Sequence, residues 1–402
     1  MRISTNQMQQ QGVNSMLEQQ ALLAKTQLQV STGKRILTPA DDPAAAAQVL
    51  NLMQEKEVTG QYQSNADAAR GRLSLEEQAL TGAGDVMQRL KELAIQANNS
   101  TLNNANRASI AAEARLRLDE LLSLANTRDA NNEYLFSGYQ GTTQPFNRNA
   151  AGGFDYNGDE GQRYLQIGPT RQVAVGDSGT DVFRAIRNGN GIFSAQESPA
   201  NIGSGVIDPG TVSGTFVPDS YTISFVQVLP TDPVTYTVTG AVSGAVAAGT
   251  YAAGSSIAFG GAKVQVKGSP ANGDSFTVAP SANQDIFTTV QDFVQALETP
   301  VTNPASQAHF NNAMSRVLGD LDNGLTNILD VRAKIGARMN AIDAQKGIND
   351  GFTLQVQQTL SNLQDLDYAE AVSRLNLQMT GLQAAQQSFI KIQGLSLFNF
   401  LR

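Results

Sequence analysis

Residues 16–30 have the sequence MLEQQALLAKTQLQV, in which Met16, Leu23 and Val30 recur at intervals of seven. Apolar residues at this spacing form one narrow stripe along an α-helix, and such a stripe packs against a partner helix. No Gly or Pro interrupts the stretch. It therefore predicts a long helix near the N-terminus that pairs with another helix.

Similar stripes occur in both halves of the chain, so helices are expected from both ends. Their apolar residues are spaced by seven or by steps of three and four: Leu73, Leu80, Met87 and Ala94; Ala111, Ala114, Leu118, Leu121 and Ala125; Leu321, Ile328, Ile335 and Ile342; and Val372, Leu375, Met379, Leu382 and Phe389. A turn is predicted at 98–101, where Asn, Ser and Thr break the pattern. Matching periodicity predicts that the C-terminal helices return alongside the N-terminal ones, with both termini at the same end.

The middle of the chain has a different composition. Residues 138–300 hold 23 of the 36 Gly and 10 of the 13 Pro. Large residues alternate with hydroxyl side chains in 221–226 and 234–239, a pattern typical of half-buried strands, with a turn at 229–233 between them. Further strands are predicted at 256–259, 263–266 and 275–278, and a helix at 286–297.

These patterns predict an α+β fold, in which long antiparallel, coiled-coil-like helices from both chain ends carry an inserted β-rich outer domain. We expect terminal axial helices that depend on assembly in 1–42 with 350–402. A helical core domain is expected in 43–147 with 285–349. The outward-facing β-rich domain is expected in 148–284.

Composition excludes several classes of function. The chain has no Cys, a single His and a net charge of −8. Thiol chemistry, disulfides and Cys-based zinc sites need thiolates, and a catalytic triad or His-rich metal site would rest on His309 alone. An acidic chain with scattered Lys and Arg is a poor partner for nucleic acid or an anionic membrane. We expect no enzyme activity, no cofactor, no metal, no nucleic acid and no membrane among its functions and partners.

Candidate chemical residues have simpler structural interpretations. Asp42 before Pro43 is typical of a helix start, with Asp at the N-cap and Pro at the first helical position. The loop that begins at Asp155 lacks the Gly and Glu of a calcium-binding EF-hand. Asp155, Asp159, Asp177 and Asp181 could pair as carboxylates for glycan chemistry, but their turn-rich surroundings favour loop formation.

Gln-rich polar faces mark the terminal helices. Residues 351–402 contain nine Gln. Uncharged amides suit a helix surrounded by identical neighbours, because they hydrogen-bond without ion desolvation. We expect both ends to be largely disordered in the isolated chain and to fold on assembly. The alternative is an antiparallel coiled coil that is already stable in the monomer. The residues predicted to pack subunits together are Met16, Leu23, Val30, Leu375, Met379, Leu382 and Phe389.

Several stretches resemble the flagellin family. They are STGKRI (31–36), PADDPAA (39–45), RLKELAIQANN (89–99), LDYAEA (366–371) and LSLFNFLR (395–402), within a resemblance that covers roughly residues 1–147 and 310–402. The segment NEYLFSG (132–138), followed by Pro145-Phe146, is similar to family members at the junction between hook and filament rather than to filament flagellins.

The resemblance implies a structural, extracellular subunit of the bacterial flagellum. Its implied partners are identical subunits in a ring, a neighbouring hook-associated protein, flagellin and a cytoplasmic export chaperone that holds the C-terminal helix. It also implies secretion through the flagellar type III channel without a cleaved signal peptide. Two alternatives stay open, a filament flagellin and a flagellar subunit whose outer domain is adhesive or binds glycans.

Overall fold

The computed structural model describes residues 5–99, 102–229 and 231–398. Packing divides the chain into two compact units, with residues 1–64 and 345–402 in unit 1 and residues 65–344 in unit 2. The domain boundaries predicted above rest on amino-acid composition, and they remain a prediction. Parts of the predicted turns at 98–101 and 229–233, and the last residues of the segment 395–402, lie outside the described residues.

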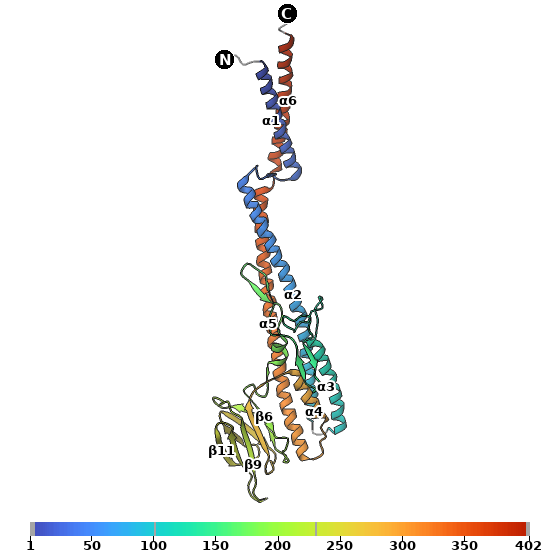
Figure 1. The fold of residues 1–402 in the computed structure, drawn as a ribbon, viewed down its shortest axis with the longest axis vertical. Coiled ribbons are helices and arrows are strands. Elements are labelled where there is room, and N and C mark those ends of the chain that lie inside the picture. Colours follow the sequence, from blue (N-terminus) through green and yellow to red (C-terminus); the bar gives the residue numbers. More distant parts are fainter. Residues whose placement is uncertain (1–4, 100–101, 230, 399–402) are drawn as a thin grey trace. The chain divides into compact units, whose positions relative to one another are not determined.

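Unit 1 is built from helices that come from both chain ends. They are α1 (Thr5–Thr32), the first part of α2 (Pro43–Ala97), the last part of α5 (Pro304–Gln364) and α6 (Tyr368–Phe398). Helices α1 and α6 lie side by side and run in opposite directions, so the start of α1 lies beside the last part of α6 (Figure 1). No helix in the described ranges is long and apolar enough to cross a membrane.

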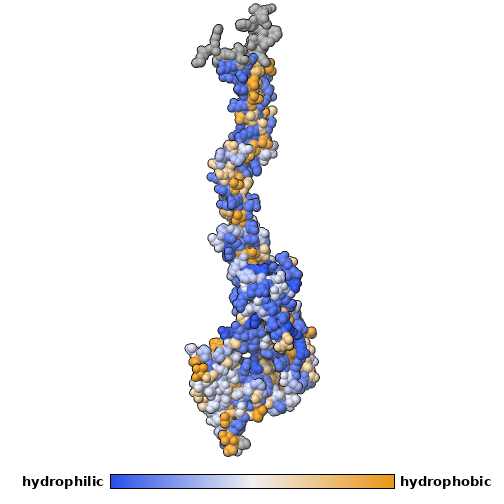
Figure 2. Space-filling view, in the orientation of Figure 1, coloured by the Kyte–Doolittle hydropathy of each residue, from blue (hydrophilic) through white to orange (hydrophobic). Residues whose placement is uncertain are grey.

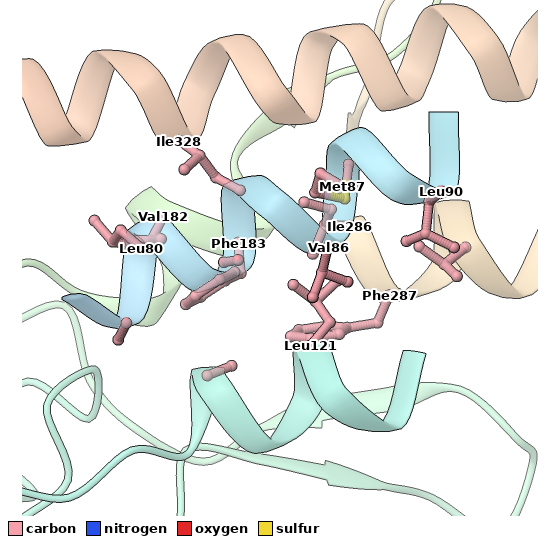
Figure 3. Packing of buried hydrophobic residues seen from close by; sticks show 14 of the residues in the cluster. Leu80, Val86, Met87, Leu90, Leu121, Val182, Phe183, Ile286, Phe287 and Ile328 are labelled. Carbon is pink, nitrogen blue, oxygen red and sulfur yellow. The ribbon is translucent and has the colours of Figure 1, made fainter. Parts of the chain in front are cut away.

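Unit 2 has a helical core that the heptad stripes predict correctly. It contains the rest of α2 and α5 with α3 (Asn104–Ala125) and α4 (Ile286–Glu298). Leu73, Leu80, Met87 and Ala94 are fully buried, as are Leu321, Ile328, Ile335 and Ile342. Figure 3 shows Leu80 and Met87 of α2 among residues from α3, α4, α5 and the segment near Phe183.

Capping residues fix the helix starts. The Asp42 carboxylate accepts a hydrogen bond from the Ala45 backbone N–H at 3.0 Å, which confirms the predicted start of α2. Asn103 accepts from the Asn106 N–H at 2.8 Å at the start of α3. Asp285 accepts from the Thr288 N–H at 2.6 Å at the start of α4.

The segment after α3 packs onto these helices through short strands and an aromatic cluster. The elements are β1 (Phe146–Arg148), β2 (Phe154–Tyr156), β3 (Tyr164–Gln166), β4 (Gln172–Ala174), the π-helical turn η1 (Thr180–Arg184) and β5 (Ile186–Arg187). Phe146 and Phe183 lie edge to face at 5.6 Å between ring centroids, and each also contacts Phe287 of α4. This segment therefore shares the hydrophobic core of the helices.

The remaining strands of unit 2 enclose a second core. An antiparallel five-stranded sheet has the order β11-β10-β9-β14-β6, and a smaller sheet has the order β12-β13-β7 with β8 also paired to β13. The strands are β6 (Phe193–Glu197), β7 (Val206–Ile207), β8 (Thr211–Val212), β9 (Tyr221–Val226), β10 (Thr235–Gly240), β11 (Gly244–Thr250), β12 (Ser256–Phe259), β13 (Ala262–Lys267) and β14 (Ser275–Pro280), with β15 (Asn283–Gln284) pairing to β5.

The predicted strands are confirmed as β9, β10, β12, β13 and β14, and the predicted helix at 286–297 as α4. Residues from these strands, including Tyr221, Phe225 and Phe276, form a hydrophobic cluster separate from the helical core. Strand β11 was not predicted, because its Gly and Ala residues lack the large alternating side chains that signal a strand.

Candidate subunit interface

Helices α1 and α6 pack against each other through matching stripes. Residues of lower exposure recur at alternating steps of four and three from Gly12 to Val30 on α1, and from Ala371 to Phe389 on α6. We call these two stripes the α1–α6 seam. The aromatic ring of Phe389 lies over Gly12, where a Cβ atom would stand only 3.1 Å from ring carbon Cδ2. The small residue therefore lets the two helices approach closely.

Most of the residues predicted to pack subunits lie in this seam. Within one chain the half-buried ones are Met16, Leu23, Val30, Leu375, Leu382 and Phe389, whereas Met379 is 42% exposed. The seam joins helices of the same chain. A role for these residues between subunits stays a prediction.

Backbone hydrogen bonds join the two loops at the base of the seam. Gly33, with φ of +69°, follows the last residue of α1, and its carbonyl accepts from the Leu366 N–H at 2.9 Å. The Arg35 N–H donates to the Gln364 carbonyl at 2.7 Å. The loop before α2 is thus bonded to the loop before α6.

Asp41 organises the loop between α1 and α2. Its Oδ2 atom accepts from the N–H groups of Leu37 and Thr38 at 3.0 and 2.9 Å, and its Oδ1 atom lies 2.6 Å from the Lys25 ammonium. The Lys25 ammonium, followed by these two N–H groups, holds the pKa of Asp41 well below its usual range. The charged carboxylate therefore stays available to hold the loop at neutral pH.

Outside the seam, large apolar residues are exposed on several faces of both helices. They are Val13, Leu17, Leu22 and Leu28 on α1, and Val372, Leu377, Met379 and Ile390 on α6. Charged residues are few, with Glu18 and Lys25 on α1. Figure 2 shows apolar side chains between polar ones along these helices. Apolar residues on more than one face indicate that these helices have more apolar surface than their pairing with each other covers.

The parts of α2 and α5 in unit 1 bury polar as well as apolar residues, Val356 and Leu360 among the apolar ones, and they leave other apolar residues exposed. Thr59, Gln345 and Asn349 are buried, and the Gln345 amide donates to Asn349 at 2.9 Å. In contrast, Leu50 of α2 and Ile348 of α5 are 68% and 61% exposed. The exposed apolar side chains are candidates for contact with other molecules.

Sequence reasoning missed these exposed residues. Leu17, Leu28 and Leu377 lie off the heptad positions, so a search for one stripe passes over them. The sequence feature that could have identified them is that α1 and α6 contain more Leu residues than one seam needs. Together with Leu50 and Ile348 they make up what we call the outer apolar surface of unit 1.

The polar candidates from the sequence do not form a catalytic group. Asp155 accepts from Asn149, and Asp159 accepts from the N–H groups of Tyr139 and Gly161, as expected of loop formers. Asp181 lies in η1 and begins a turn with Ser178, whose hydroxyl accepts from its N–H. The described residues contain no group of three or more His, Asp or Glu that could hold a metal ion.

Asp177 has a role that the loop interpretation missed. Its carboxylate is buried and forms a bidentate pair with Arg338 at 2.7 and 2.8 Å. Its backbone N–H donates to Glu76 at 3.0 Å. It therefore links the segment after β4 to α2 and α5 in the helical core.

Comparisons with known proteins place both ends of the chain in one family. Residues 3–141 match the bacterial flagellin N-terminal helical region, and residues 318–401 match the bacterial flagellin C-terminal helical region. A curated relative, flagellar hook-associated protein 3 of Escherichia coli (strain K12), is 29% identical over 99% of both chains. That similarity includes the middle segment, which the flagellin regions leave out.

Solved structures give the same result. The chain is similar to the flagellar hook-associated protein-3 of Legionella pneumophila, with a TM-score of 0.76 and 35% identity over 78% of this chain and 98% of the other. It is also similar to the flagellar junction protein FlgL from Legionella pneumophila, with a TM-score of 0.72 and 35% identity over 79% of this chain and all of the other.

Proposed function

This chain belongs to the flagellar hook-associated protein 3 family, and we propose that it connects to neighbouring flagellar subunits through the outer apolar surface of unit 1. It is a structural subunit of the flagellum that forms the junction between the hook and the flagellin filament. Similarity over the full length to hook-associated protein 3, rather than over the helical ends alone, favours this function over that of a filament flagellin.

The exposed apolar residues of unit 1 carry the proposal. Leu377 of α6 is 76% exposed, although most large apolar side chains of a stable monomer are covered. Identical copies packed side by side would bury such residues, and few like charges would be brought together. The α1–α6 seam would hold the two helices of one chain together through Met16, Leu23, Val30, Leu375, Leu382 and Phe389. Met379, which is exposed, would belong to the outer apolar surface of unit 1.

The individual partners form a further part of the proposal. They are identical subunits in a ring, a second hook-associated protein on the hook side, flagellin on the filament side, and a cytoplasmic chaperone that covers α6 before export. Export would proceed through the type III channel to the extracellular flagellum. The exposed apolar residues of α6 support the chaperone, because such a surface needs cover before assembly. Removal of residues 368–402 is expected to abolish its co-purification.

Electron microscopy of cells that lack this gene tests the function. Complete hooks without filaments, together with flagellin lost to the medium, are the expected result. Filaments still attached to hooks would contradict the assignment to the junction.

Complementation of the cells that lack this gene tests the outer apolar surface of unit 1. Leu377→Asp should fail to restore filaments, because assembly would bury an unpaired carboxylate. Leu116→Asp is the matched control, since Leu116 is a similarly exposed leucine, 70%, on α3 in unit 2. If Leu377→Asp restores filaments as well as the control does, the outer apolar surface is not an interface.

Leu382→Asp distinguishes the role of the α1–α6 seam from that of the outer apolar surface. Leu382 is half-buried between α1 and α6, so its substitution should block incorporation. If α1 and α6 already form a coiled coil in the monomer, the alternative to folding on assembly, it should also lower the helix content of the purified monomer. Leu377→Asp should leave the helix content unchanged. Circular dichroism of the two purified variants makes the comparison, and equal helix loss in both would contradict the division into seam and surface.

A further inference from the structure

Unit 2 contains two bodies that each have a hydrophobic core. The helices and the segment after α3 share one cluster, and the strands from β6 to β14 enclose another, with no described residue in common. We call residues 193–280, which hold the second cluster, the sheet domain. Figure 1 shows its strands β6, β9 and β11 grouped beside α5. The contact between the two bodies is therefore a feature separate from either core.

A two-stranded neck joins the sheet domain to the helical core. The chain enters the domain after β5 and leaves it before β15, and these two short strands pair with each other. The Asn323 amide of α5 donates to the carbonyls of Arg187 and Gly189 at 2.9 Å each. Asp320 of α5 accepts from the Gly189 N–H at 2.8 Å. The neck is thus fixed to α5.

Beyond the neck, polar side chains of α5 hold the sheet domain. The buried amide of Asn312 accepts from the Ile207 N–H at 2.9 Å and donates to the Gly205 carbonyl at 3.1 Å. Arg316 forms an ion pair with Glu197 of β6. When such contacts open, water can satisfy the same polar groups, so their net contribution to docking is modest.

A cavity of about 510 Å³ lies between the neck and the Asn312 contact. Gly189 and Asp320 line it on the side of the neck, and Ile207 and Asn312 line it on the other side. Along α5 the two sides are about 12 Å apart, at the rise of an α-helix. Protein cores are close-packed, with few voids larger than a water molecule. This part of the contact therefore contributes little van der Waals packing.

We infer that the sheet domain undocks from α5 as a rigid body and turns about the neck while both cores stay folded. Opening at Asn312 separates polar groups across a cavity, whereas unfolding either core exposes a whole hydrophobic cluster. Polar contacts between domains of one chain commonly permit relative motion. The motion is independent of the contacts proposed for unit 1. It would let the sheet domain change position against neighbouring molecules without disturbing the helical core.

Two nitroxide labels test this motion, and the absence of Cys from the chain makes their attachment specific. The label sites are Thr237→Cys, exposed on β10, and Asp330→Cys, exposed on α5. Pulsed electron spin resonance of the full-length chain measures the distribution of distances between the labels. We expect a narrow main distance and a minor, broad population. Asn312→Ala should raise the ratio of broad to narrow populations about tenfold or more, because the docked state loses both Asn312 hydrogen bonds.

Asn327→Ala is the matched control. Asn327 also lies on α5, and its amide donates to the carbonyls of Asp181 and Val182 at 2.9 and 2.8 Å, so its bonds stay within the helical core. This variant should leave the distance distribution unchanged. A single narrow distance in Asn312→Ala, or equal broadening in both variants, would overturn the inference.

Amide hydrogen exchange distinguishes undocking from unfolding. The backbone amides of β9 and β10 should keep their protection in Asn312→Ala, because the core of the sheet domain stays intact. Broadened distances together with lost protection in these strands would contradict motion as a rigid body. If Asn312→Ala does not fold, Arg316→Gln takes its place, since it removes the ion pair with Glu197. It should broaden the same distance, and an unchanged distribution would overturn the inference.

Discussion

Glu76 is a carboxyl group buried in the helical core, and its replacement by Gln should stabilise the protein at neutral pH. Glu76 is 1% exposed, and its Oε1 atom accepts from the Asp177 N–H at 3.0 Å. Its Oε2 atom has no hydrogen-bond partner among the described residues. Burial, followed by the negative charge of Asp177, raises the pKa of Glu76 from 4.5 to about 8.

The raised pKa sets the sign of the pH dependence. Between pH 4.5 and about 8 the folded state keeps a proton that the unfolded state releases, so stability falls as pH rises through this window. Each pH unit in the window lowers the free energy of unfolding by about 1.4 kcal/mol. From the usual pKa to neutral pH the loss is therefore about 3 kcal/mol.

Glu76→Gln removes this loss and keeps the hydrogen-bond acceptor. The variant should be more stable than the parent by about 3 kcal/mol at neutral pH, with a difference that disappears near pH 4. Urea unfolding followed by circular dichroism, at several pH values, measures the difference. Asp85→Asn is the control, because it removes one charge from an exposed position of the same helix. A stability difference that does not change with pH would refute the reasoning.

Substitutions at two further positions test a buried ion pair of unit 2 and a helix cap of unit 1. Arg338→Leu should lower the free energy of unfolding by about 3 kcal/mol or more, because it leaves the buried Asp177 carboxylate without its bidentate partner, and urea unfolding measures the loss. Asp42→Ala should cost about 1 kcal/mol by removing the N-cap of α2, while Asp42→Asn should retain most of the stability, and a larger loss in the Asn variant would contradict the capping role.

Periodicity predicted the helical part of the fold because burial there repeats along a single element. Leu73, Leu80 and Met87 are one face of α2, and any residue on that face meets the same core. The alternation of large residues with hydroxyl side chains predicted β9 and β10 for the same reason, because burial repeats along each strand. Strand β11 has no such signal, because its Ala and Gly side chains barely distinguish one face of the sheet from the other.

The residues that line the cavity of unit 2 beside α5, Glu197, Asp292 and Asp320 among them, could not be brought together from the sequence, because their proximity depends on topology. Glu197 lies in β6, Asp292 in α4 and Asp320 in α5, and each has local surroundings typical of a strand edge or an exposed helix face. Only the docking of the second sheet core against α5, through Asn312, brings them together. The acidic residues that stand out in the sequence, Asp155, Asp159, Asp177 and Asp181, lie among turn residues, and that setting favours loop formation.

A heptad stripe also leaves its partner helix undefined. Met16 and Leu382 have the spacing of an interface, and α1 and α6 of one chain already bring these stripes together. In our proposal, contacts with neighbouring molecules use residues off the stripe, such as Leu17 and Leu377, which are exposed on other faces. A helix that packs with its own chain on one face and with several neighbours on the others needs apolar residues on more than one face, as α1 has. The seam thus specifies the pairing of α1 with α6, and we propose that the exposed leucines specify its assembly.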